Sequence, residues 1–84
     1  MAEAPADADI AAALLALAHR RGHRASFCPS EVARALSGDW RGLMPRVRAQ
    51  ALVLTRARRL VATQKGAAVD LAAARGPVRL RLAP

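Results

Sequence analysis

The stretch PRVRAQALVLTRARRLVATQKG, residues 45–66, decides the fold of this 84-residue chain. Its first part carries Val47, Ala51 and Leu54 at helical spacing, which predicts a helix at residues 45–59. The LVATQ run that follows alternates in the manner of a half-buried strand, and the Lys-Gly pair after it marks a turn. A helix that leads directly into a β-hairpin is therefore expected here.

The second strand of that hairpin is predicted downstream, in the string PVRLRL at residues 77–82. Its aliphatic side chains fall on one side of a strand, and Arg79 and Arg81 fall on the other. The hairpin spans residues 60–82, with a long loop in which Asp70 is expected to cap a short helical turn.

Two shorter helices are predicted upstream. The first covers roughly residues 8–21, is capped by Asp7 or Asp9 and ends at Gly22. Its apolar stripe recurs at helical spacing: Ile10, Leu14 and Leu17.

The second short helix lies in FCPSEVARAL, residues 27–36, where Pro29 suits the first helical position. Val32 and Leu36 are its predicted buried pair, and Gly38 is expected to stop it.

A separate helical turn at residues 40–44 is predicted next, capped by Asp39. Because proline removes a helical hydrogen bond, Pro45 is expected to begin a fresh helix and not to continue that turn. Trp40 is expected to plug the core between helices.

The resulting order predicts an α+β fold: a winged helix with three helices followed by a two-stranded β-hairpin wing. A chain of this length makes one small domain, expected at residues 8–84 after a disordered tail at residues 1–7.

Four strings, FCPSEVARAL (27–36), WRGLMPRVR (40–48), TQKG (63–66) and RGPVRLRL (75–82), resemble a small bacterial family known only as a domain of unknown function. The resemblance implies a winged-helix-like fold and no established activity, so it carries over no catalytic residue. The position after TQKG is often basic in that pattern, whereas here it is Ala67.

The charge of the chain is unevenly distributed. Residues 1–39 hold four arginines and five acidic residues, a net charge of −1, whereas residues 40–84 hold nine arginines and one lysine against Asp70, a net charge of +9. A basic helix and hairpin predict binding of double-stranded DNA through helix 45–59 and the wing 60–82, because cations displace counterions from phosphates. The predicted contact residues are Arg46, Arg48, Arg56, Arg59, Lys65, Arg79 and Arg81.

The alternative function is a protein-interaction module that docks an acidic partner, since a fold does not fix a function. An exposed apolar strip at Leu52 and Val53, or interruption of the basic face by Asp70 or the acidic N-terminal segment, favours this alternative. The oligomeric state stays open.

Catalysis and metal binding find little support in the sequence. His19, His23 and Cys28 lack an orienting third group for a nucleophile and a fourth ligand for zinc. We therefore expect neither an enzyme nor a bound cofactor.

The chain is expected to be cytoplasmic. Its single cysteine, Cys28, excludes an internal disulfide, and acidic residues stand where a signal peptide needs positive charge. The apolar run at residues 10–18 is too short to span a bilayer, so no membrane association is expected.

Overall fold

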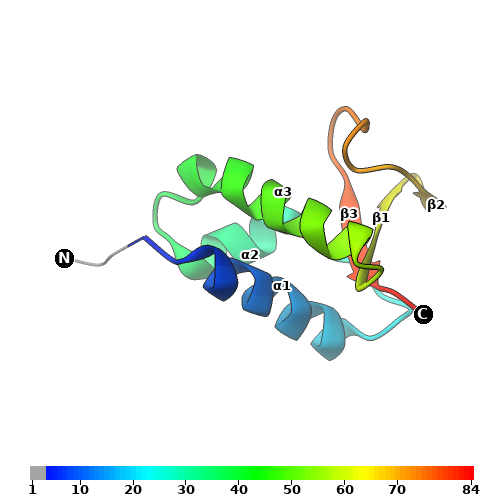
Figure 1. The fold of residues 1–84 in the computed structure, drawn as a ribbon, viewed down its shortest axis with the longest axis horizontal. Helices are drawn as coiled ribbons and strands as arrows, with labels where there is room; N and C mark the ends of the chain where they lie inside the picture. The colour runs from blue at the N-terminus through cyan, green and yellow to red at the C-terminus, as the bar shows by residue number, and fades with distance from the viewer. Residues whose placement is uncertain (1–3) are drawn as a thin grey trace.

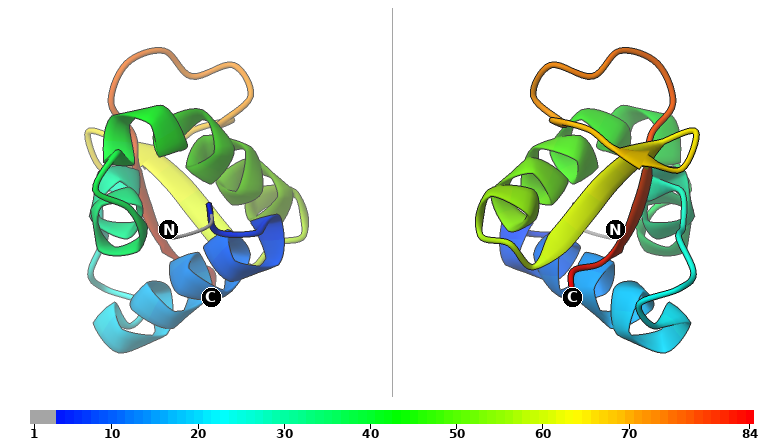
Figure 2. Two further views of the ribbon diagram at one scale, coloured as in Figure 1. Left: turned by 90° about the vertical axis from the view of Figure 1, so that its left-hand side faces the viewer. Right: turned by 90° about the vertical axis from the view of Figure 1, so that its right-hand side faces the viewer.

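The computed structural model describes residues 4–84, which form three helices and then a small three-stranded antiparallel sheet (Figure 1). The elements are α1 (Asp7–Arg21), α2 (Pro29–Leu36), α3 (Trp40–Arg56), β1 (Leu60–Gln64), β2 (Ala67–Ala68) and β3 (Arg79–Leu82). The helices cover one side of the sheet and leave the other side open (Figure 2). This α+β fold is compatible with the predicted winged-helix arrangement. Residues 1–3 of the predicted tail lie outside the described residues.

The sheet has the order β2-β1-β3, one strand more than predicted. The extra strand, β2, arises because Lys65 and Gly66 both take positive φ values, 51° and 81°. Two such residues form the tight turn that returns the chain directly alongside β1. The loop predicted from Ala67 onward therefore begins as a paired strand.

A single hydrophobic core fills the space between the helices and the sheet. Phe27 lies at its centre, fully buried, and exchanges both backbone hydrogen bonds with Leu80 at N···O distances of 2.7 and 2.8 Å. Phe27 thus extends the sheet beyond β3 before α2 begins. Leu71, in the loop after β2, is also buried, although the sequence did not single it out.

The ends of α1 and α2 follow local chemistry, with small corrections. Ala6, not an aspartate, occupies the N-cap position of α1, and the Asp9 carboxylate accepts a hydrogen bond from the Ala6 N–H at 3.0 Å. Pro29 opens α2 as predicted, whereas the helix already stops at Ser37, before Gly38. Leu36, predicted to be buried with Val32, is only half-buried. Ala33 is the residue that is buried beside Val32 in the core.

The prediction that Pro45 begins a fresh helix is wrong, since α3 runs unbroken from Trp40. Asp39 caps it, as predicted, by accepting a hydrogen bond from the Gly42 N–H at 3.3 Å. Leu43 and Val47, on either side of the proline, are both buried on the same face. Burying them together outweighs the one helical hydrogen bond that proline cannot donate.

Helix α3 also ends earlier than the predicted Arg59. Arg58 takes a left-handed φ of 60°, and the N–H groups of Arg58 and Arg59 bond the carbonyls of Thr55 and Leu54. These two bonds form a Schellman motif with arginine at the position that usually holds glycine. The chain turns there directly into β1.

Candidate functional site

The solvent-facing side of α3 is apolar along most of its length. Pro45, Ala49 and Val53 are exposed and recur at the spacing of one helix face, and 56 % of Val53 is accessible to solvent. Arg41 and Arg56 are exposed near the two ends of this row. A helix that reads base edges in a major groove needs polar donors and acceptors along this face.

A hollow of about 350 Å³ lies beside this apolar row, between α3 and the loop that follows β2. We call it the α3–loop groove; its walls are Pro45, Arg48, Ala49, Leu52, Leu71 and Ala72. Buried Leu71 anchors the loop to the core, and the Asp70 carboxylate accepts a hydrogen bond from the Ala72 N–H at 3.0 Å. Asp70 thus caps a short turn, as predicted.

Three of the seven predicted DNA-contact residues are bonded within the molecule. Arg46 donates to the Pro5 carbonyl at 2.7 Å and pairs with the Asp7 carboxylate at 2.8 Å. Arg48 donates to the Ala74 carbonyl at 3.0 Å, which holds the loop against α3. The acidic N-terminal segment therefore interrupts the basic face at Arg46.

Arg79 is the third bonded residue. Its guanidinium donates to the Ser26 hydroxyl at 2.7 Å and to the Ser26 carbonyl at 3.0 Å. These bonds fasten the open side of β3 to the segment that leads into α2.

The other four predicted residues lie in separate places. Arg56 is exposed on α3, and Arg59 lines a hollow with Arg58, His19 and His23 near the ends of α1 and α3. Across the residues that the structure describes, neither arginine side chain makes a hydrogen bond or an ion pair.

Lys65 and Arg81 belong to the wing. Lys65 shares the surface at the wing tip with Arg75, around Gln64, whose amide donates to the carbonyls of Arg75 and Pro77. Arg81 is half-buried on the open side of the sheet, and its Nε has no hydrogen-bond partner within residues 4–84. The seven predicted residues therefore lie in different local surroundings, and three of them are already bonded within the molecule.

A bonded network surrounds the N-terminus of α2. The Glu31 carboxylate pairs with Arg21 at 2.6 Å and accepts the Cys28 N–H at 2.9 Å, while Arg21 also donates to the Ser26 carbonyl at 3.3 Å. The Cys28 hydrogen bond lowers the pKa of Glu31, partial burial opposes this, and the charges of Arg21 and Arg79 lower it further. We call these five residues the α2 network.

Cys28 and the two histidines lie in different surroundings. The Ser30 hydroxyl donates to the Cys28 sulfur at 3.1 Å, whereas His19 and His23 line the hollow near Arg58. Within residues 4–84, no group of three or more histidine, cysteine or acidic side chains is placed to hold a metal ion.

Trp40 is half-buried against the core and lies between two cations. The guanidinium carbons of Arg34 and Arg41 lie 4.3 and 4.4 Å from the centroid of its ring. Both arginines therefore make cation–π contacts with the indole, which the residue pattern alone did not predict.

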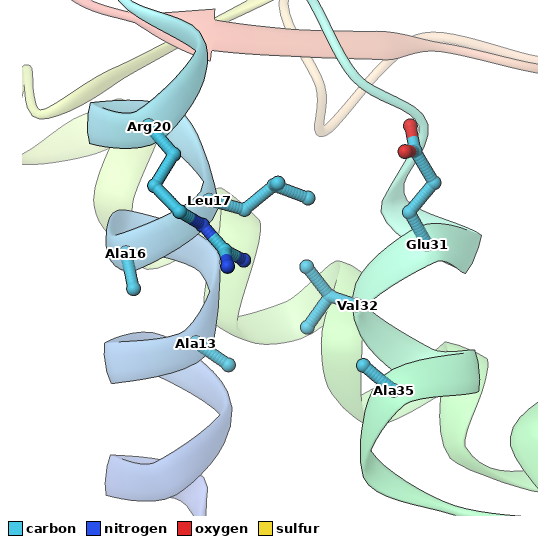
Figure 3. Close-up of a pocket in the computed structure, with 7 residues that line it drawn as sticks. All are labelled: Ala13, Ala16, Leu17, Arg20, Glu31, Val32 and Ala35. Carbon is cyan, nitrogen blue, oxygen red and sulfur yellow. The ribbon is translucent and has the colours of Figure 1, made fainter.

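A second hollow, of about 460 Å³, lies between α1 and α2 (Figure 3). We call it the α1–α2 groove; it is lined by Ala13, Ala16, Leu17, Arg20, Glu31, Val32 and Ala35. It could not be found from the sequence because Leu17, expected in the apolar stripe with Ile10 and Leu14, is only half-buried in the structure. The signal was the presence of three alanines, Ala13, Ala16 and Ala35, on these two helices, whose small side chains leave space unfilled.

The family model described as a protein of unknown function (DUF3253) matches residues 7–83, which include all six helices and strands. The chain belongs to the DUF3253 family. No curated protein matches this DUF3253 domain. Over residues 4–84, none of its helices has the length and apolar character needed to cross a membrane.

Proposed function

We propose that this DUF3253 domain is a non-enzymatic interaction module that binds an acidic, amphipathic segment of a partner protein in the α3–loop groove. The observation that carries the proposal is the exposed apolar row of α3, with Val53 beside a hollow walled by Leu52 and Leu71. Exposed apolar surface next to a groove is typical of protein-binding sites.

The charge of the domain defines the chemistry of the partner. The net charge is +8, and Arg41 and Arg56 stand near the two ends of the apolar row. Acidic residues flanking an apolar face complement this arrangement and increase the association rate. A second copy of the chain carries the same positive charge, so mutual repulsion opposes its docking here.

The test is a titration of the ¹⁵N-labelled domain with an amphipathic helical peptide of leucine and glutamate, beside a scrambled peptide of the same composition. We expect amide shifts at Ala49, Leu52, Val53 and Leu71 with the amphipathic peptide only. Unlocalised shifts, or equal shifts with both peptides, would refute the proposal.

A matched pair of variants sharpens this test. Ala49 and Ala12 are both exposed helical alanines, but only Ala49 lines the groove. We expect Ala49→Glu to weaken peptide binding by about tenfold or more through repulsion and steric blockage, a cost of about 1.4 kcal/mol. Ala12→Glu should bind as the unmodified domain does, and equal losses in both variants would contradict the assignment of the groove.

Binding of duplex DNA is the second candidate function, supported by 14 basic residues against six acidic ones. Arg56, Arg59 and Lys65 are exposed without intramolecular bonds among the described residues. Because the exposed row of α3 between Arg41 and Arg56 is apolar, such binding would rest on phosphate contacts and would discriminate little between sequences.

A salt titration separates the two candidates. Four to six phosphate contacts give a slope of about −4 to −5 in a plot of log affinity against log salt. An Arg56→Ala/Arg59→Ala variant should reduce the magnitude of that slope by about 2, whereas Ala49→Thr should leave it unchanged. Absence of DNA binding at low salt removes this candidate, and DNA binding without peptide binding would replace the first proposal with it.

A further inference from the structure

The α1–α2 groove has the size and lining of a small-molecule site and shares no residue with the α3–loop groove. Its volume of about 460 Å³ falls in the range that holds small organic ligands. Leu17 and Val32 extend toward each other across the groove, and Ala13 and Ala35 point into the same gap (Figure 3). Such walls favour a hydrocarbon group.

One unpaired charge is directed into this space. The guanidinium of Arg20 reaches from α1 into the gap between the helices (Figure 3), and Arg20 makes no hydrogen bond or ion pair across residues 4–84. Glu31 also lines the groove, but its carboxylate points away from the apolar walls. Both of its oxygens are already bonded, one to Arg21 and the other to the Cys28 N–H.

We propose that the α1–α2 groove binds an aliphatic carboxylate, a medium-chain fatty acid. The hydrocarbon chain lies against Leu17, Val32 and the alanines, and the carboxylate accepts hydrogen bonds from Arg20. A guanidinium binds a carboxylate through two parallel hydrogen bonds, which gives selectivity for this head group. The positive charge of the whole domain adds to the attraction of an anion.

The experiment compares three ligands with the same chain and different head groups: decanoate, decanol and decylamine, each below its micellar concentration. Binding to the full chain is followed by amide shifts and by calorimetry. We expect shifts at Ala13, Leu17, Val32 and Ala35 with decanoate, weaker binding of decanol and the weakest binding of decylamine. Equal affinities, or shifts spread over the surface, would show detergent-like adsorption and overturn the proposal.

Variants test each half of the site. Arg20→Gln should weaken decanoate binding about tenfold and leave decanol binding unchanged, because only the charged head group loses its partner. Arg24→Gln is the matched control, since Arg24 lies outside the groove. If Arg20→Gln and Arg24→Gln weakened decanoate binding equally, the role of Arg20 would be refuted.

Filling the groove tests the apolar half. Ala35 is exposed, so Ala35→Leu should keep the fold while it occupies the space and weakens both decanoate and decanol. Unchanged binding in this variant would place the ligand elsewhere. Two other results would contradict the proposal. One is a peptide ending in leucine that binds these residues more tightly than decanoate does. The other is concentration-dependent dimerisation of the domain that shifts the same amide signals without ligand.

Discussion

The α2 network and the α3–loop groove differ in how fully their side chains are engaged within the molecule. Around Ser26 and Glu31, the guanidinium groups of Arg21 and Arg79 are bound to carboxylate, hydroxyl and carbonyl oxygens. Along α3, the outward side chains between Arg41 and Arg56 are apolar, and the predicted contact residue Arg48, in the wall of the groove, holds a loop in place. In the α2 network, charged side chains are concentrated and bonded to one another or to the backbone. Beside the α3–loop groove, apolar side chains are left without packing partners.

This difference shows why charge density alone does not locate a binding site. A guanidinium with several donors bonds any backbone carbonyl or carboxylate within reach, and it is then less available to an outside ligand. An apolar side chain left exposed has no such internal partner, and only a ligand can remove it from water. The candidate sites of this domain therefore lie at its two apolar grooves.

The largest predicted effect is a loss of folding stability when a buried residue beside the α2 network is truncated. Phe27→Ala removes a fully buried ring from the bridge residue that follows Ser26 and should cost about 3–5 kcal/mol. Urea denaturation followed by circular dichroism measures the loss. Val53→Ala, on the exposed row of α3, is the control and should stay within about 0.5 kcal/mol of the unmodified domain. Similar losses in both would contradict the contrast between the two regions.

The next predicted effect is a gain in folding stability, from a substitution in the wall of the α3–loop groove. Pro45→Ala restores an N–H that can bond the Arg41 carbonyl inside α3, so we expect stabilisation by about 1–2 kcal/mol. Thermal unfolding measures it. Ala49→Pro, one turn further along the same exposed face, is the mirror-image variant and should destabilise by about 3 kcal/mol. Destabilisation by Pro45→Ala would mean that the ring contributes more to the groove than it costs the helix.

Arg79 gives a smaller effect that sharpens the comparison. Arg79→Met keeps the aliphatic part of the side chain and removes both bonds to Ser26, at a cost of about 1 kcal/mol after solvent exposure is considered. Lys65→Met removes an exposed cation of the same wing that has no such bonds, and it should change stability by less than about 0.5 kcal/mol. Equal effects would show that the bonds of Arg79 contribute little to the fold.

The smallest effect concerns the pH dependence of the α2 network. Because the pKa of Glu31 is lower in the folded than in the unfolded chain, its carboxylate stabilises the fold above about pH 5.5, and this contribution is lost as the pH falls through the lowered pKa. Glu31→Gln should therefore be less stable at pH 7 by at most about 1 kcal/mol and should approach the unmodified domain near pH 3.

Urea titrations at pH 7, 5 and 3 test this convergence. Arg21→Gln is the partner control. In that background, replacing Glu31 by glutamine should change the free energy of unfolding by less, because the ion pair at 2.6 Å is then already lost. A difference that stays constant down to pH 3 would show that the charge of Glu31 does not stabilise the fold.

Local patterns in the sequence predicted most of the fold. The stripe of Ile10 and Leu14 predicted α1, the proline at position 29 predicted the start of α2, and the Lys-Gly pair marked the turn after β1. These features depend on the conformational preferences of a few adjacent residues, so they can be recognised without knowledge of the rest of the chain. The continuation of α3 through Pro45 could not be recognised in this way, because residues distant in the sequence bury Leu43 and Val47 together.

The sequence by itself determined the order of the elements, the basic charge of the chain and the family to which it belongs. Only the tertiary structure decided which arginines are engaged, since Arg48 bonds a residue 26 positions away, Arg46 one 41 positions away, and Arg79 one 53 positions away. It also decided where apolar surface stays unfilled, between α1 and α2 and beside α3. Charge and periodicity are properties of residues along the chain, whereas hydrogen-bond partners and packing depend on residues that only folding brings together.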